Sequence, residues 1–142
     1  MAYFPDDMPG VEPNWDDREF WAACAERRLL VQACAACDTP RHPPSPMCPV
    51  CHSTRIRWLD APDRGRIYSF TVVRHASHPA VTSRLPYVVA VIEFPELHGV
   101  RLVSNVTDAD PATMKIGQSV DLWWDQLTDG TYLPRFRPSA GA

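Results

Sequence analysis

Two Cys-x-x-Cys pairs, separated by ten residues, constrain this chain more than any other feature of its sequence. They are Cys34 with Cys37 and Cys48 with Cys51. Each pair can present two sulfur atoms from one tight turn, and two such turns place four thiolates about 2.3 Å from a metal ion. Because four thiolates leave no position open for water or substrate, the spacing predicts a structural zinc site. Iron in the same geometry and a pair of redox-active dithiols without metal are the alternatives.

The residues around these cysteines predict a rubredoxin-like zinc ribbon over residues 29–62. Short strands are expected at 29–33 and 55–59, one beside each pair. Five prolines between residues 39 and 49 exclude a regular helix or a central strand there. A segment of this size has almost no apolar core, so metal binding should supply most of its folding free energy.

The second half of the chain reads as a series of β-strands. Polar or proline-containing turns separate the apolar segments, and Asp110 is placed to cap a single helical turn that begins at Pro111. Five strands with a short helix between the third and fourth predict an OB-fold barrel over residues 63–138, followed by a tail at 139–142. The expected strands are 66–74, 87–93, 100–106, 119–124 and 131–136.

The N-terminal segment predicts an arm and a helix, which complete a mainly β fold. Residues 1–14 read as a loosely held arm, and residues 15–28 as a helix with Asn14 at its N-cap. Phe20, Trp21 and Cys24 share one face of that helix, which would dock on the rest of the protein or on a partner. Cys24 is expected to be a buried thiol without a function.

The charge and hydropathy of the chain argue against a nucleic-acid-binding, a secreted or a membrane protein. The net charge is −3 and Lys115 is the only lysine, which argues against general nucleic-acid binding. The first twelve residues are acidic, unlike a secretory signal, and the longest strongly apolar run, 87–92, is too short to span a bilayer. We therefore expect a cytoplasmic protein with reduced cysteines and no contact with a membrane.

Several sequence blocks, in this order, resemble one known family. This family comprises zinc-ribbon/OB-fold proteins associated with acyl-CoA metabolism and formerly named a domain of unknown function. The resemblance covers about residues 15–138. It rests on Phe20-Trp21, Cys34-Ala-Ala-Cys37, the proline-rich run 43–51, Gly65-Arg-Ile-Tyr-Ser-Phe-Thr71, Leu85-Pro-Tyr-Val-Val-Ala90, Gly99-Val-Arg-Leu102, Ile116-Gly117 and Leu133-Pro-Arg-Phe136.

The resemblance implies an accessory subunit that is not an enzyme by itself. Family members resemble companions of thiolase-fold enzymes, including thiolase-like aldolases, thiolases and acyltransferases. The implied assembly is a hetero-oligomer in which this chain helps to form or channel an acyl-CoA site, in steroid or lipid degradation. The resemblance carries over no catalytic residue, so a CoA thioester enters only as a ligand shared with the partner.

Two groups of residues are candidates for contact with CoA or the partner, because arginine can bind phosphate through two hydrogen bonds. The first group lies in the loop after the first barrel strand, and the second lies in the ribbon and the last strand. The groups are Arg74, His75, His78 and Arg84, and then Arg41, Arg55, Arg57, Arg135 and Arg137. Phe136, at the end of the last strand, is expected either to cover the barrel or to contact a partner. Solvent-exposed charge is the alternative explanation for both groups.

Three further expectations remain open at this point. Trp123 and Trp124 are adjacent, so one should fill the barrel and the other should face outward. A nucleic-acid-binding OB-fold module with a zinc ribbon is the alternative to the accessory subunit. A self-sufficient acyl-CoA enzyme that uses His75 or Cys24 is a third hypothesis.

Overall fold

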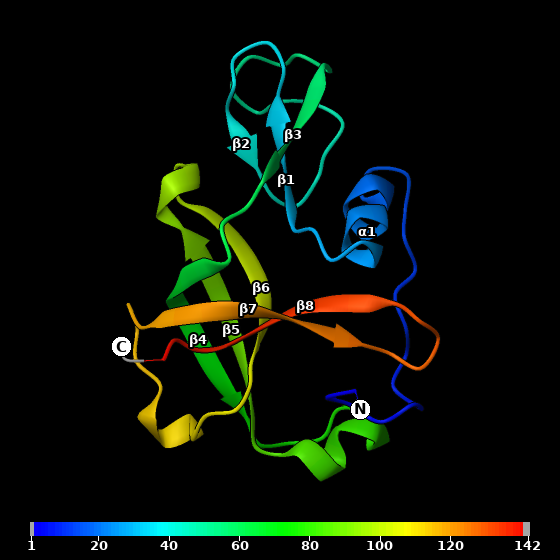
Figure 1. The fold of residues 1–142 in the computed structure, drawn as a ribbon, viewed down its shortest axis with the longest axis vertical. Coiled ribbons are helices and arrows are strands. Elements are labelled where there is room, and N and C mark those ends of the chain that lie inside the picture. The colour runs from blue at the N-terminus through cyan, green and yellow to red at the C-terminus, as the bar shows by residue number, and fades with distance from the viewer. Residues whose placement is uncertain (1, 141–142) are drawn as a thin grey trace.

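One helix and two sheets make up residues 2–140, the part of the chain that the computed structural model describes (Figure 1). Three short 3₁₀ helices lie in the connections of the barrel. The elements in chain order are α1 (Arg18–Ala25), β1 (Leu30–Cys34), β2 (Pro40–Arg41), β3 (Ile56–Asp60), β4 (Arg64–Val73), η1 (Pro79–Arg84), β5 (Tyr87–Phe94), η2 (Pro95–Leu97), β6 (Val100–Val106), η3 (Pro111–Thr113), β7 (Ser119–Gln126) and β8 (Tyr132–Pro138).

The ribbon is a three-stranded antiparallel sheet in the order β2-β1-β3. It projects from one side of the barrel (Figure 1). Cys34 ends β1, and the other three cysteines lie in loops of the ribbon. Pro40 lies in β2, which is an edge strand, and a proline is tolerated there because no neighbour needs its missing N–H group. The predicted strands of the ribbon are confirmed to within one residue at each end.

The five remaining strands close a barrel in the order β4-β5-β6-β8-β7, which confirms the predicted OB-fold. Alternate residues of β5 are buried, as period-two patterning requires for a strand with one face toward a core. The barrel closes where Val106 of β6 pairs with Phe136 of β8 in parallel orientation. Asp110 caps η3 as predicted, because its side chain accepts a hydrogen bond from the N–H of Ala112.

Gly65 is needed where β4 crosses β5 at close range. A Cβ atom at this position would lie 2.6 Å from Cγ2 of Ile92 and 3.1 Å from the carbonyl oxygen of Glu93. Any side chain larger than hydrogen would therefore push β5 away from β4. This crowding is the physical reason for glycine in the Gly-Arg-Ile-Tyr block.

The N-terminal helix is shorter than predicted. Residues 15–17 form a turn, in which Oδ1 of Asn14 accepts hydrogen bonds from the N–H groups of Asp16 and Asp17. The helix ends at Ala25 because Arg27 has a φ of 56°, a left-handed conformation that helices cannot continue through. The predicted extension of the helix to Arg28 is therefore wrong. The earlier end could not be read from the sequence, because no glycine follows Ala25 to mark it.

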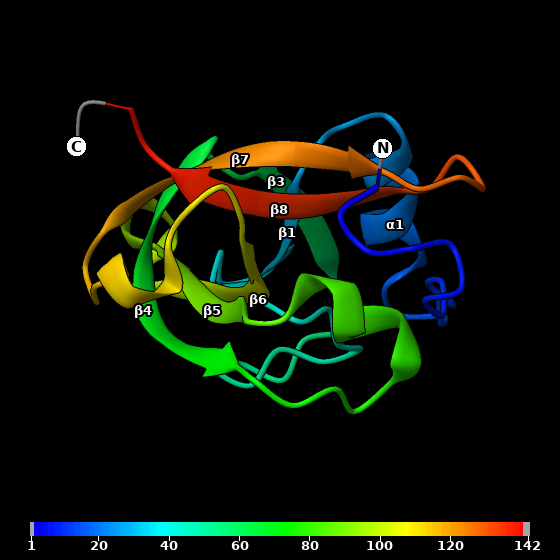
Figure 2. The ribbon, with the colours of Figure 1, turned by 90° about the horizontal axis from the view of Figure 1, so that it is seen from below.

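The N-terminal arm is fixed to the barrel and is not loosely held as predicted. The N–H of Tyr3 donates to the carboxylate of Asp125, and Phe4 is buried with its ring edge-on to Tyr87 at a centroid distance of 5.2 Å. Arg84 also donates to the carbonyl oxygen of Tyr3. Figure 2 shows the arm along the end of the barrel where β7 and β8 are joined. Met1 lies outside the described residues.

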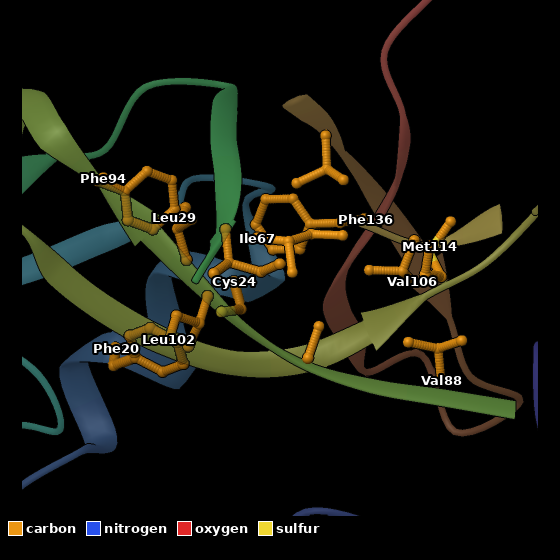
Figure 3. Close-up of a cluster of buried hydrophobic side chains, with 13 residues drawn as sticks. Phe20, Cys24, Leu29, Ile67, Val88, Phe94, Leu102, Val106, Met114 and Phe136 are labelled. Atoms are coloured by element: carbon orange, nitrogen blue, oxygen red, sulfur yellow. The ribbon is translucent and has the colours of Figure 1, made fainter. Parts of the chain in front are cut away.

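A single hydrophobic cluster joins the helix to the barrel (Figure 3). Phe20 and Cys24 of α1 and Leu29 before β1 pack with the inward residues of the barrel. Trp124 packs against the same cluster, whereas Trp123 donates from Nε1 to Oγ1 of Thr107. The division of the chain at residues 28 and 62 stays a prediction, because the cluster contains residues from both sides.

The start of the predicted tail is packed against the barrel. Of the predicted tail, Ser139 is buried and donates to Oδ1 of Asp121 at 2.7 Å, while residues 141–142 lie outside the described part. Within residues 2–140, no helix combines the length and the hydropathy that crossing a membrane requires.

Candidate metal centre and the pocket beside it

The four predicted cysteines come together at the end of the ribbon. Their sulfur atoms all lie within 4.8 Å of one another, with Cys34 and Cys51 at 3.5 Å and Cys37 and Cys48 at 3.7 Å. Bonds of about 2.3 Å to one zinc ion would place the sulfurs of a regular tetrahedron about 3.8 Å apart. The donor set and its spacing therefore fit a zinc ion bound by four thiolates.

The backbone around Cys34 and Cys48 supports the thiolate form of these two residues. The N–H groups of Ala36 and Cys37 point at Sγ of Cys34 at 3.3 and 3.4 Å, and the N–H of Val50 points at Sγ of Cys48. The hydrogen bond from the backbone of Cys37 contributes most to lowering the pKa of Cys34 to about 6. A hydrogen bond from the backbone of Cys51 likewise lowers the pKa of Cys48. Hydrogen bonds of this kind stabilise the anion that a metal requires.

The two knuckles repeat one backbone geometry. The N–H of Asp38 donates to the carbonyl of Cys34, and the N–H of His52 donates to the carbonyl of Cys48. Both residues have a positive φ, 66° for Asp38 and 64° for His52, which closes each turn. His52 therefore closes a turn, and among the described residues only the four cysteines form the metal cluster.

A pocket of about 360 Å³ lies where the helix, the ribbon and the barrel meet. Phe20 and Trp21 line it from α1, and His42 with two prolines lines it from the ribbon. Side chains of β5, β6 and β8 complete the wall. These are Val89, Leu102, Val103, Ser104, Asn105, Leu133, Pro134 and Arg135.

A buried ion pair lies at the polar end of this pocket. Nε of Arg135 donates to Oδ2 of Asp125 at 2.6 Å, and Nη1 donates to Oδ1 of Asn105 at 2.5 Å. Asp125 is only 1% exposed, and it also accepts from the N–H of Tyr3. Asn105 in turn donates to the carbonyl of Val88, so the network links four strands and the arm.

His42 is neutral in this environment. Burial lowers the pKa of His42 to about 4, because the charged imidazolium would lose its hydration. Its ring packs against Phe20 at a centroid distance of 5.3 Å, which places it on the aromatic side of the pocket.

Acid is expected to destabilise the chain through His42. The unfolded histidine titrates near 6.5, above its folded value, so the stabilisation is complete above about pH 6.5 and is lost as the pH falls toward 4. The loss should reach at most about 3 kcal/mol, and less where solvent screens the charge. Urea unfolding of zinc-saturated protein at pH 7 and at pH 5 measures this loss of unfolding free energy. His42→Gln should reduce the pH dependence and exposed His75→Gln should not; equal behaviour of the two variants contradicts the assignment.

The first group of candidate contact residues lies on and beside η1. Arg74 and His75 are exposed in the loop that precedes it. His78 is the N-cap of η1, and its Nδ1 accepts a hydrogen bond from the N–H of Ala80. Arg84 lies over the ring of Tyr3 at 5.0 Å. His78 and Arg84 therefore have structural partners within the chain, while Arg74 and His75 face solvent.

The second group is not brought together as one surface. Arg41 is buried in the ribbon, where it donates from Nε to Oγ of Ser45 and from Nη2 to the carbonyl of Ser45. Arg135 is buried in the barrel with Asp125. Phe136 is completely buried in the core, so the prediction that it contacts a partner is wrong. Its side chain faces inward because Phe136 pairs with Leu122 and Val106 at the closure of the barrel.

Sequence reasoning missed Asp125, Asn105 and Phe4. The predicted strand 119–124 ends before Asp125, and a carboxylate after two tryptophans gives no sign of burial. Its role depends on Arg135 and on the arm, and the arm is 122 residues away in the chain. No local pattern could have identified this contact.

Two family models match this chain. The model described as the rubredoxin-like zinc ribbon domain of ChsH2 matches residues 21–57, and the model described as the C-terminal OB-fold domain of ChsH2 matches residues 58–125. Together they cover both sheets of the structure except for β8 and the last residue of β7.

Three curated relatives are similar to the chain. A probable enoyl-CoA hydratase alpha subunit of Thermomonospora curvata is 44% identical, over 87% of this chain and 38% of the relative. The 3-oxo-4,17-pregnadiene-20-carboxyl-CoA hydratase alpha subunit of Mycobacterium tuberculosis is 36% identical, over 82% of this chain and 36% of the relative. The chain thus spans little more than a third of these two relatives. A DUF35 domain-containing scaffold protein of Methanothermobacter thermautotrophicus is 31% identical, over 72% of this chain and 76% of the relative.

A solved structure shares the complete architecture. It is described as the Ltp2-ChsH2(DUF35) aldolase, and the matched chain is 41% identical with a TM-score of 0.82. The match covers 91% of the present chain and 98% of the other.

Proposed function

The chain belongs to the DUF35 family, whose members combine the ChsH2-type zinc ribbon with an OB-fold, and on this premise we propose that it is a non-catalytic accessory subunit of a thiolase-fold enzyme. The partner would be a thiolase-like aldolase, a thiolase or an acyltransferase that acts on CoA thioesters in steroid or lipid degradation. The accessory subunit would help to form or channel the acyl-CoA site, in the cytoplasm.

The observation that carries this proposal is the likeness to the ChsH2(DUF35) chain of the aldolase. At 41% identity, the match covers 91% of the present chain, so it must include most of both the ribbon and the barrel. The similarity to a hydratase subunit named for a pregnadiene carboxyl-CoA supports steroid thioesters as the substrate class. The similarity to a scaffold protein supports a non-catalytic role.

The chemistry of the side chains supports the same role. Four thiolates around one zinc ion leave no site at which the metal could polarise a substrate, so the metal would hold the ribbon in shape. Burial raises the pKa of Cys24 to about 12, and a thiol in that state is a poor nucleophile. Cys24 is therefore unsuited to the chemistry that a self-sufficient acyl-CoA enzyme would require.

The exposed residues of the loop before η1 are the proposed contacts. Arg74 and His75 face solvent, and a cationic side chain there could meet a phosphate group or an acidic partner surface. The net charge of −3 supports local contacts of this kind over a general nucleic-acid groove.

Co-expression with a thiolase-like aldolase from the same genome tests the proposal. We expect a stable hetero-oligomer in size-exclusion chromatography with light scattering, and CoA-thioester turnover that neither chain has alone. Arg74→Glu should weaken assembly or raise the KM for the thioester at least tenfold. Lys115→Glu, an exposed charge on the η3 side of the barrel, is the matched control and should leave both unchanged.

Two results would contradict the proposal. One is a monodisperse chain that does not bind the partner at micromolar concentrations. The other is salt-dependent binding of a single-stranded oligonucleotide at the same concentrations, which would favour the nucleic-acid module.

A further inference from the structure

The pocket beside the ribbon has the size and the lining of a small-molecule site. Its volume of about 360 Å³ falls in the range of about 300 to 1,000 Å³ that is usual for ligand pockets. Rings and aliphatic side chains make up most of its wall. Phe20 and Trp21 meet edge to face at a centroid distance of 5.0 Å, and His42 lies against Phe20.

The walls of this pocket are rigid and come from three separate elements. Pro43 and Pro44 form the ribbon side, and Pro134 belongs to β8. Val89 and Val103 lie on the outer face of β5 and β6, opposite the side chains that fill the barrel. Figure 3 shows Phe20 of α1 next to Leu102 of β6, so the helix is held against the strands by the shared core. A pocket with fixed walls favours a rigid ligand, because neither partner then loses much conformational entropy on binding.

The charges at the pocket favour a ligand without charge. The guanidinium of Arg135 is neutralised by Asp125, and His42 is neutral because its pKa is lowered by burial. Asp17 at the helix start contributes a carboxylate, which would repel an anionic group. A phosphate or free carboxylate would therefore find no unpaired cation among these residues.

Among the described residues, the guanidinium of Arg135 has one nitrogen without a hydrogen-bond partner. Arg135 uses Nε and Nη1 for Asp125 and Asn105, and within residues 2–140 no hydrogen bond from its Nη2 is found. Ser104 already donates its hydroxyl proton to the carbonyl of Pro134 at 2.7 Å. A neutral carbonyl oxygen on the ligand could use the remaining guanidinium N–H groups, whereas the opposite aromatic end would pack against rings.

We propose that this pocket binds an uncharged, fused-ring skeleton that carries a ketone, the ring portion of the acyl group of a CoA thioester. This inference rests on the proposed function, which supplies the thioester, and adds the site in this chain that recognises the rings. The pocket would then select the acyl group by shape, while the CoA portion lies outside it.

Binding of progesterone, a neutral tetracyclic ketone, tests this assignment on the zinc-loaded full chain. NMR titration of ¹⁵N-labelled protein should shift the indole N–H of Trp21 and the amides of Val103 and Leu133 before the solubility limit of the steroid. Calorimetry should give a micromolar Kd, and decan-2-one, a flexible ketone, should bind at least tenfold more weakly.

Variants that fill or spare the pocket complete the test. Val103→Trp adds a large ring at an exposed strand position in the pocket wall and should weaken progesterone binding at least tenfold. Ile116→Trp makes a comparable change at a residue 71% exposed and outside the pocket, and should leave the Kd unchanged. The inference is overturned by absent shifts, by shifts at another surface, or by a Val103→Trp variant that binds as tightly as the unmodified chain.

The partner enzyme separates this inference from the proposed function. If the chain assembles with the partner but never binds progesterone, only the inference fails. If it binds progesterone in this pocket but does not assemble, only the proposed function fails. If the partner itself shifts the Trp21 indole signal and displaces progesterone, the occupant is a partner side chain and the inference is overturned.

Discussion

Replacing Cys34 by serine is expected to abolish zinc binding and to unfold the ribbon. The four sulfur atoms lie within 4.8 Å of one another, and a serine hydroxyl does not ionise to supply the missing anionic ligand. Zinc in small ribbons contributes about 10 to 16 kcal/mol of apparent binding free energy, which is folding free energy because the site does not exist in the unfolded chain. We expect the zinc affinity to fall at least about 1,000-fold, or about 4 kcal/mol.

Elemental analysis and competition with a chromogenic chelator measure this effect. The unmodified chain should hold one zinc ion, and the Cys34→Ser variant should hold none in the presence of the chelator. Cys24→Ala is the matched control, since Cys24 is a buried thiol outside the metal cluster and its loss changes packing only. Full zinc content in the Cys34→Ser variant, or no metal in the unmodified chain, would contradict the four-thiolate site.

Loss of the metal should also reach the helix. Leu29 directly precedes β1 and packs with Phe20 and Cys24 in the core cluster that continues into the barrel. When β1 loses its sheet, the amides of α1 should lose protection from hydrogen exchange together with those of β1 and β3. The amides of β5 should stay protected, because β4 and β6 pair with that strand on both sides.

Replacing Asp125 by asparagine is expected to cause the largest loss of stability in the barrel. The pair with Arg135 is 2.6 Å long and both side chains are less than a tenth exposed, so the variant leaves an unpaired buried guanidinium. Breaking a buried pair by removing one partner costs about 3 to 5 kcal/mol. Asparagine keeps one acceptor oxygen, so Arg135 and the N–H of Tyr3 would compete for it, which should loosen the arm.

Urea unfolding with saturating zinc measures this cost. Asp60→Asn is the matched control, because Asp60 pairs with Arg28 at the surface, where both side chains are more than half exposed. Exposed pairs contribute about 0 to 1 kcal/mol, so the midpoint of Asp60→Asn should lie close to that of the unmodified chain. Equal losses in the two variants would show that the Asp125–Arg135 pair adds no more than a surface contact.

Features that depend on short stretches of chain were predictable from residue spacing. The four cysteines of the ribbon, the order of the five barrel strands and the Asp110 cap of η3 are confirmed by the structure. Each Cys-x-x-Cys pair and the Asp110 cap involve groups only a few residues apart, and β5 shows an alternating pattern along one strand. The physical constraint is therefore contained in a segment that can be read by itself.

Contacts between distant segments were decided by the tertiary structure alone. The end of α1 at Ala25 has no glycine to mark it, and the arm is fixed through a hydrogen bond between Tyr3 and Asp125. The pocket exists only because α1, the ribbon and β6 are held against one core. Asp125 and Arg135 are buried because the barrel closes and because strands and the arm cover the pair. Neither the closure nor the covering can be read from residue spacing. Residue spacing thus determined the metal ligands and the strand order, whereas the charge and shape of the pocket depend on packing between segments that are far apart in the chain.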